Sequence, residues 1–168
     1  MKIQVNSEIG KLKTVLLHRP GKELENLTPD LLERLLFDDI PYLKVAQEEH
    51  DAFAKTLRDC GVEVLYIEHM VVEALDHHPE VRQQLINQFV EESNILSNSV
   101  KNAVYEFLIH LDNKALVSKM IEGIRTHEVV LKHSFTILDM LENEYPFFAD
   151  PLPNILFQRD PFASIGDG

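Results

Sequence analysis

The sequence predicts a mixed α/β fold: a strand, a helix and a second strand, then a long helical segment, then a return to extended backbone. Two short apolar runs, residues 11–18 and 62–67, are typical of buried strands. A three- and four-residue hydrophobic periodicity between them indicates a helix, and the same periodicity recurs through residues 71–145. The strand, helix, strand order favours a crossover unit with a covered sheet.

The first segment has clear signals at both ends of each element. The run KLKTVLLH, residues 11–18, is closed by Arg-Pro-Gly, which suits a strand that ends in a turn. Thr28 and Pro29 fit the N-cap and first position of a short helix, residues 29–37. A longer amphipathic helix is expected between Pro41 and a stop at Gly61, and residues 62–67 form the second strand.

The helical segment predicts a small all-α bundle with its own core. Polar stretches at residues 92–99, 111–114 and 124–128 are expected to connect its helices, and the last helix is expected to run through Leu131, Phe135, Leu138 and Leu141. Three prolines, at positions 146, 151 and 153, then exclude further helix and favour extended backbone. Residues 154–157 are therefore predicted to begin a new strand.

Composition limits the partners that we expect. The 168 residues include 16 basic and 28 acidic side chains, a net charge of -12, which disfavours nucleic acid and anionic membranes. The longest apolar runs are far shorter than a membrane span. Cys60 is the only cysteine, so an internal disulfide is excluded and a reducing, cytoplasmic location is expected.

Three candidate chemical groups have a simpler structural interpretation. The cluster at residues 47–51, QEEHD, lacks a known metal-ligand spacing and predicts a solvated acidic face with His50 at its edge. His18 ends the first strand, where α/β sites often form, but without a visible partner a structural role is favoured. Cys60 follows a helix C-terminus, whose dipole disfavours a thiolate, and is expected to be buried and inert. The sequence indicates neither a metal nor a cofactor.

Asp160 is the strongest candidate for binding chemistry. It lies between Arg159, which favours the ionised carboxylate, and the rigid Pro161. A carboxylate held in this way suits a planar guanidinium, whose donors match both carboxylate oxygens, and each such bond contributes about 1.5–3 kcal/mol. The alternative is a loop acid that pairs with Arg159 only to shape the turn, and spacing by itself favours that alternative.

Three separated motifs resemble the arginine deiminase family of bacteria. They are SEIGKLKTVLLHRPGKE at residues 7–23, LLFDDIP at residues 35–41 and DPLPNILFQRDPFASIGDG at residues 150–168. The resemblance runs along the whole chain and corresponds to the N-terminal part of that family. It implies an enzyme that hydrolyses L-arginine to citrulline and ammonia.

The resemblance also implies a fold and a domain division. That family adopts a pentein-type α/β propeller, five pseudo-symmetric modules with a helical domain inserted after the first. The implied fold of this chain is therefore a partial propeller with an inserted helical bundle. We expect the first module at residues 1–70, the inserted bundle at residues 71–148 and the start of a second module at residues 149–168.

Carried over position by position, the resemblance implies four substrate-site residues. Asp160 matches the acid that binds the substrate guanidinium, and Asn154 and Phe157 match residues that contact the substrate. Leu36 matches a leucine on the loop that covers the substrate. Gln158 departs from a threonine usual in the family, and Asp167 stands where asparagine is common.

The family's nucleophilic cysteine, proton-transferring histidine and glutamate, and second guanidinium-binding aspartate correspond to positions beyond residue 168. The implied mechanism is thiolate attack on the guanidinium carbon, loss of ammonia, and hydrolysis of the adduct by water. We therefore expect an N-terminal fragment that is inactive alone and forms homo-oligomers to cover exposed module edges. The alternative is a stand-alone, non-catalytic module that binds an arginine-like ligand or a protein partner.

Overall fold

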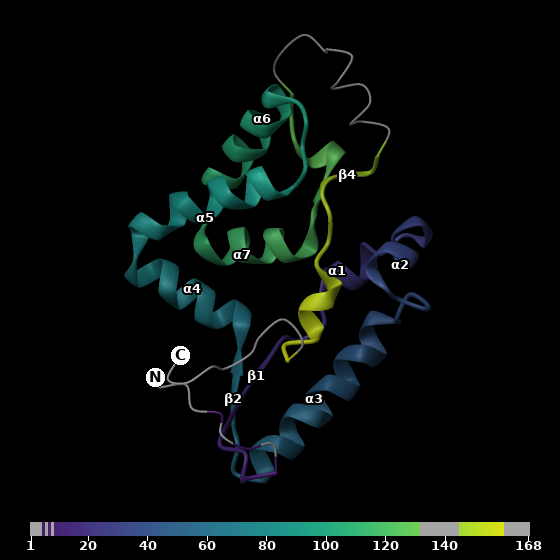
Figure 1. The fold of residues 1–168 in the computed structure, drawn as a ribbon, viewed down its shortest axis with the longest axis vertical. Coiled ribbons are helices and arrows are strands. Elements are labelled where there is room, and N and C mark those ends of the chain that lie inside the picture. Colours follow the sequence, from purple (N-terminus) through teal and green to yellow (C-terminus); the bar gives the residue numbers. More distant parts are fainter. Residues whose placement is uncertain (1–4, 6, 8, 132–144, 160–168) are drawn as a thin grey trace.

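A computed structural model of the protein describes residues 5, 7, 9–131 and 145–159 (Figure 1). Helices α4 to α7 form one group, and the strands β1 and β2 lie with α3 in another (Figure 1). The elements in chain order are β1 (Thr14–Leu17), α1 (Lys22–Glu25), α2 (Pro29–Leu35), α3 (Leu43–Asp59), β2 (Glu63–Tyr66), α4 (Ile67–His77), α5 (Pro79–Glu92), α6 (Asn98–Ile109), α7 (Asn113–Glu122), β3 (Ile124–Arg125), the 3-10 helix η1 (Thr126–Glu128), β4 (Phe147–Ala149) and the 3-10 helix η2 (Pro153–Leu156).

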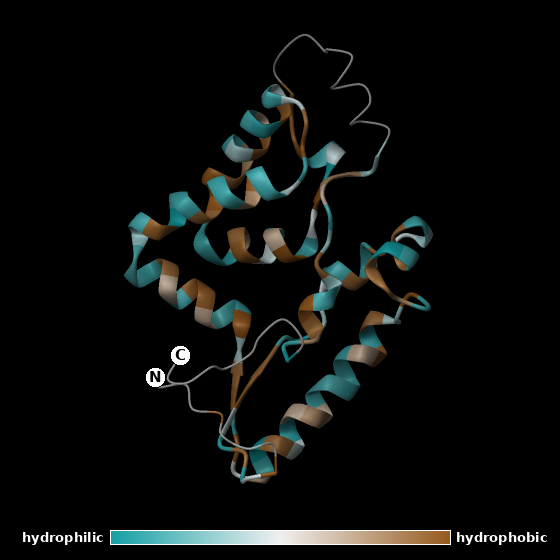
Figure 2. Cartoon of the chain, in the orientation of Figure 1, coloured by the Kyte–Doolittle hydropathy of each residue, from teal (hydrophilic) through white to brown (hydrophobic). Residues whose placement is uncertain are grey.

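Strands β1 and β2 pair in parallel, which confirms the predicted strand, helix, strand unit. Val15 lies opposite Val64 and Leu16 opposite Leu65, and Figure 2 shows β1 coloured as hydrophobic along most of its length. The second strand is shorter than expected, because Ile67 begins α4 instead of ending β2. No glycine or proline separates the two elements, so the strand passes directly into the helix.

Helix α3 ends where the sequence predicts, at a glycine in the left-handed conformation. Gly61 has a φ of 78° and donates its N–H to the Arg58 carbonyl, while the Val62 N–H reaches the Leu57 carbonyl at 3.0 Å. This pair of bonds is a Schellman motif, which satisfies carbonyls that the helix end would leave unpaired. Glycine suits the position because it has no Cβ to clash.

Helix α2 ends in the same motif, but a leucine occupies the left-handed position. Leu36 has φ 60° and ψ 40°, and the Phe37 N–H donates to the Leu32 carbonyl at 2.9 Å. The left-handed conformation costs a residue with a Cβ about 1–2 kcal/mol. The Leu36 side chain is 89% exposed, so its own packing does not offset that cost. The turn thus holds a large apolar side chain in solvent.

Helices α4 to α7 pack around the larger hydrophobic core, with α4 against α7 and α5 against α6. Two predicted connections are confirmed: α6 follows a cap at Ser97, and α7 follows a cap at Asp112. The core residues that are fully buried include Ile86, Val100, Val104, Leu108, Leu116 and Ile124. The expected domain boundary at residues 70 and 71 lies inside α4.

The third predicted connection, residues 124–128, is instead a short strand and a 3-10 turn. Strand β3 pairs antiparallel with β4, so that Ile124 lies opposite Ala149. Gly123 precedes it with a φ of 84°, and a Cβ there would lie 2.7 Å from the Pro151 nitrogen. Only glycine permits this close approach of two backbone segments. Of the residues named for the expected final helix, Leu131 is among those that the structure describes, and it is not helical. Phe135, Leu138 and Leu141 lie outside the described residues.

The predicted strand at residues 154–157 is wrong, because this stretch forms η2. Pro153 begins the 3-10 helix and is fully buried, and the Phe157 N–H donates to the Asn154 carbonyl at 3.0 Å. A proline at the first helical position has its φ already set for a helix and loses no hydrogen bond there. Extended backbone does occur earlier, in β4, as the proline pattern predicts.

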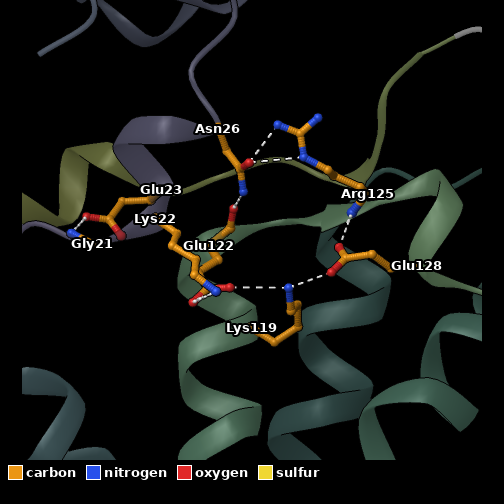
Figure 3. Close-up of polar contacts among 8 residues, drawn as sticks. All are labelled: Gly21, Lys22, Glu23, Asn26, Lys119, Glu122, Arg125 and Glu128. Atoms are coloured by element: carbon orange, nitrogen blue, oxygen red, sulfur yellow. Dashed lines mark hydrogen bonds and ion pairs between the residues drawn. The ribbon is translucent and has the colours of Figure 1, made fainter. Parts of the chain in front are cut away.

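A polar network attaches α1 to the helical group (Figure 3). The Asn26 amide donates to the Glu122 carbonyl at 2.6 Å, and its oxygen accepts two bonds from the Arg125 guanidinium, at 2.7 and 3.0 Å. Arg125 also lies over the Phe147 ring, 4.9 Å from its centroid. Backbone groups and side chains more than ninety positions apart are thereby joined, and α1 is fixed against the end of α7.

His18, at the end of β1, is buried between two carboxylates. Its Nε2 lies 3.1 Å from Glu23 and its Nδ1 lies 3.1 Å from Glu68, and only 5% of the histidine is exposed. Burial opposes a charge on the ring, but the hydrogen bonds to Glu23 and Glu68 outweigh burial and raise the pKa of His18 to about 9. The same bond lowers the pKa of Glu68 against the opposing effect of its burial. The charged contact joins β1, α1 and α4.

No helix in the described ranges is long and apolar enough to cross a membrane.

We predict that protein stability falls as the pH rises through about 9. The pKa of His18 is higher in the folded protein than the ordinary value of 6.5, so its contribution is complete below pH 6.5 and is lost as the pH passes 9. The contribution is on the order of 3 kcal/mol. Urea unfolding at pH 6.5, 8 and 9.5 should show this slope in the wild type and a flatter profile in His18→Gln. The exposed His110→Gln serves as the control, and equal slopes in all three proteins would contradict the assignment.

We also predict that Leu36→Gly stabilises the protein. Glycine removes the left-handed strain of about 1–2 kcal/mol, and its larger loss of chain entropy cancels part of that gain, so the net effect is about 0.5–1 kcal/mol. Leu36→Ala keeps a Cβ and should bring no gain. Denaturant midpoints of the two variants test the difference, and a lower midpoint for Leu36→Gly than for Leu36→Ala would refute it.

Candidate functional site

Three of the four sequence-predicted site residues lie together where α2 ends beside η2. Leu36 ends the turn after α2, Asn154 lies within η2, and Phe157 follows it. The Asn154 amide donates to the Leu35 carbonyl at 3.1 Å, which joins segments 119 positions apart. We call this contact, formed by Leu35, Leu36, Phe37, Asn154 and Phe157, the α2–η2 interface. Asp160 lies outside the described residues.

Aromatic side chains form the apolar part of the α2–η2 interface. The rings of Phe37 and Phe157 lie with their centroids 6.4 Å apart at an angle of 46°. Phe157 is 53% exposed, whereas Phe37 packs partly against the smaller hydrophobic core. That core contains Leu24, Leu27, Leu31 and Phe147. One side of the interface is therefore anchored in the fold, and Leu36 and Phe157 present apolar surface outward.

Three polar side chains join the last turn of α2 to the segment that precedes η2. The Nη2 atom of Arg34, in the last turn of α2, lies 2.6 Å from Asp150 Oδ2 and 2.9 Å from the Tyr145 hydroxyl. The Tyr145 hydroxyl donates to Asp150 Oδ1 at 2.7 Å. Burial and then the bond to Asp150 raise the pKa of Tyr145 to about 12, so the hydroxyl keeps its proton at neutral pH. We call this closed set of bonds the Arg34–Tyr145–Asp150 triad.

The other candidates named from the sequence lie away from this interface. His18 is occupied by Glu23 and Glu68, in line with a structural role, although the sequence did not reveal these partners. His50 packs against the Tyr66 ring, and burial lowers its pKa. Neither ring nitrogen of His50 has a hydrogen-bond partner among the described residues.

The expected burial of Cys60 is wrong, because the thiol is exposed. Cys60 follows the last turn of α3, a helix in which only Ala54 is fully buried. The helix therefore buries only a narrow strip of its surface. Within the described ranges, the structure has no group of three or more metal-binding side chains.

The chemistry of the α2–η2 interface suits binding. Leu36 and Phe157 offer apolar surface for the methylene part of a ligand, and an amide such as Asn154 has two N–H donors and an acceptor oxygen, of which the Leu35 bond uses one donor. Sequence reasoning found these residues through the resemblance. It missed the Arg34–Tyr145–Asp150 triad, because no local pattern relates positions 34 and 150.

Known proteins that are similar in sequence to this chain include arginine deiminases. The family model for arginine deiminase matches residues 33–168. A protein named arginine deiminase from Clostridium perfringens is 57% identical over 167 residues, and one from Mycoplasma capricolum is 54% identical over 167 residues. Both alignments cover 99% of this chain and 40% of the relative.

A further relative of the same name, from Streptococcus agalactiae, is 52% identical and again covers 99% of the chain. The chain spans 41% of that relative's length. The match thus involves the whole of this sequence and the smaller part of each relative. Because the family model covers most of the chain, the chain belongs to the arginine deiminase family.

Proposed function

We propose that this chain is the N-terminal part of an enzyme that hydrolyses L-arginine to citrulline and ammonia. The observation that carries the proposal is the α2–η2 interface, where motifs 119 positions apart come together through the Asn154 bond to Leu35. Membership of the arginine deiminase family supports the reaction, since the relatives bear that name.

In the proposed site, Asp160 binds the substrate guanidinium through paired charge-assisted hydrogen bonds. Asn154 and Phe157 contact the substrate, and Leu36 covers it. The left-handed, exposed Leu36 supports this role, because strained residues are often retained where a side chain serves a site and not the core. The strain holds the leucine outward before substrate arrives.

The bond-breaking groups of the proposed enzyme lie beyond residue 168. A cysteine thiolate attacks the guanidinium carbon, ammonia leaves, and water cleaves the carbon–sulfur bond to release citrulline and the thiol. Residues 1–168 contribute substrate-binding groups. We therefore propose that residues 1–168 alone are inactive, and that no cofactor or metal takes part.

We further propose the pentein arrangement of that enzyme for this chain, with the first propeller module at residues 1–70, the inserted helical bundle at residues 71–148 and the start of the second module at residues 149–168. The parallel β1 and β2 pair supports it. Val45 and Phe53 of α3 are 44% and 53% exposed. This exposed apolar surface supports the proposal that later modules, or a second copy in a homo-oligomer, cover α3. We propose a cytoplasmic location for that enzyme.

Asp160→Ala in the full-length protein should lower kcat/KM for L-arginine about 100-fold or more. Loss of two charge-assisted bonds removes about 3 kcal/mol or more, and each 1.4 kcal/mol is tenfold. Citrulline release measures the effect. Asp59→Asn removes an exposed acid at the end of α3 and should leave activity unchanged, whereas full activity in Asp160→Ala would exclude the guanidinium-binding role.

The chain of residues 1–168 alone should release no citrulline from L-arginine, because it lacks the proposed nucleophile. The same assay with the full-length protein is the positive control. Citrulline release by residues 1–168, abolished by Cys60→Ser, would show instead that Cys60 acts as a nucleophile and would contradict the proposal.

A further inference from the structure

The Arg34–Tyr145–Asp150 triad lies beside the proposed substrate residues without belonging to them. Arg34 precedes Leu36 by two positions, and Asp150 precedes Asn154 by four. Both oxygens of Asp150 are engaged, one by the Arg34 guanidinium and the other by the Tyr145 hydroxyl. Arg34 also bonds the hydroxyl, so each member of the triad contacts the other two.

The triad is too exposed for its main effect to be stability. Arg34 is 54% exposed and Asp150 is 30% exposed, and ion pairs at such positions contribute little to the free energy of unfolding because water screens them. A closed set of three bonds does, however, restrict orientation, because the guanidinium and carboxylate are planar and the phenol is rigid. Its effect is therefore geometric.

The chain from Asp150 to Asn154 is stiff enough to transmit that geometry. Pro151 and Pro153 lie between them, and both are fully buried. Each proline ring fixes φ near −65°, so few backbone torsions can absorb a shift of Asp150. On the other side, Arg34 lies in the helical turn whose end places Leu36 in the left-handed conformation. A displacement of the triad would therefore reach both halves of the α2–η2 interface.

We propose that Arg34, Tyr145 and Asp150 are positioning residues that hold the Leu36 turn against Asn154 and Phe157, and that they thereby set substrate affinity. The effect on affinity rests on the proposed function, whereas the coupling of the two segments does not. Bond breaking belongs to groups elsewhere in the proposed enzyme. Loss of the triad thus acts on KM and leaves kcat nearly unchanged.

The kinetic test uses the full-length protein and the variants Arg34→Met and Asp150→Asn. Each should raise KM for L-arginine about tenfold and change kcat less than twofold, and the double variant should be no worse than either single variant, because both remove one unit. Tyr145→Phe removes only a hydroxyl and should have the same effect in smaller degree, which keeps the test valid if a charge variant fails to fold.

Arg58→Met is the matched control. Arg58 also lies in the last turn of a helix, 5.8 Å from the centroid of the Tyr66 ring, and donates to that tyrosine's hydroxyl at 3.5 Å, but the helix is α3. Its substitution should leave KM unchanged. An equal rise of KM in Arg58→Met and Arg34→Met would overturn the proposal, as would a fall in kcat with KM unchanged in the triad variants.

Amide hydrogen exchange tests the coupling without reference to activity. The Phe37 amide donates to Leu32 and the Phe157 amide donates to Asn154, one on each side of the interface. In Arg34→Met and in Tyr145→Phe both amides should exchange about tenfold faster, while the Leu116 amide of α7 does not change. Unchanged exchange at Phe37 and Phe157 would overturn the proposal whatever the kinetics. If the wild type released no citrulline, the proposed function would fail. Exchange at these two amides would then still show whether the triad couples the Leu36 turn to Asn154 and Phe157.

Discussion

The charged contact of His18 with Glu23 and Glu68 is the interaction on which the arrangement of this chain depends. It lies where β1 ends, and the two carboxylates come from α1 and α4, so one buried ring orients three elements. Burial away from water strengthens the contact. It also means that loss of one partner would destabilise the fold, because an unpaired buried charge is costly. The strand pair, α1 and the helical group are therefore held in one relative position.

Further contacts connect α1 to the rest of the chain. Asn26 follows α1, and its side-chain oxygen accepts a hydrogen bond from the Arg125 guanidinium while its amide donates to the Glu122 carbonyl. These bonds fix the end of α7 and the start of β3. Strand β3 in turn pairs with β4, the strand that leads to η2. The α2–η2 interface is thus the last step in a sequence of contacts that begins at a buried histidine.

Helices α2 and α3 both end in left-handed turns, but with different residues at the left-handed position. Gly61 meets the requirement of α3 at little cost, and Leu36 meets the same requirement of α2 with strain. A fold selected only for stability would favour glycine at both. The leucine, exposed beside Asn154 and Phe157, is consistent with a side chain retained for contact with a ligand, and the nearby triad limits how far its turn can move.

Local chemistry by itself determined the parallel strand unit, the stop of α3 at Gly61, the start of α2 at Pro29 and two of the connections between helices, because periodicity, proline and glycine act within a few residues. Resemblance to a family supplied the candidate site residues. Only the tertiary structure decided that β3 pairs with β4, that residues 153–156 form a 3-10 helix, that Cys60 is exposed and that Arg34 meets Asp150. These features depend on contacts between positions far apart in the chain, where burial and pairing outweigh local preference.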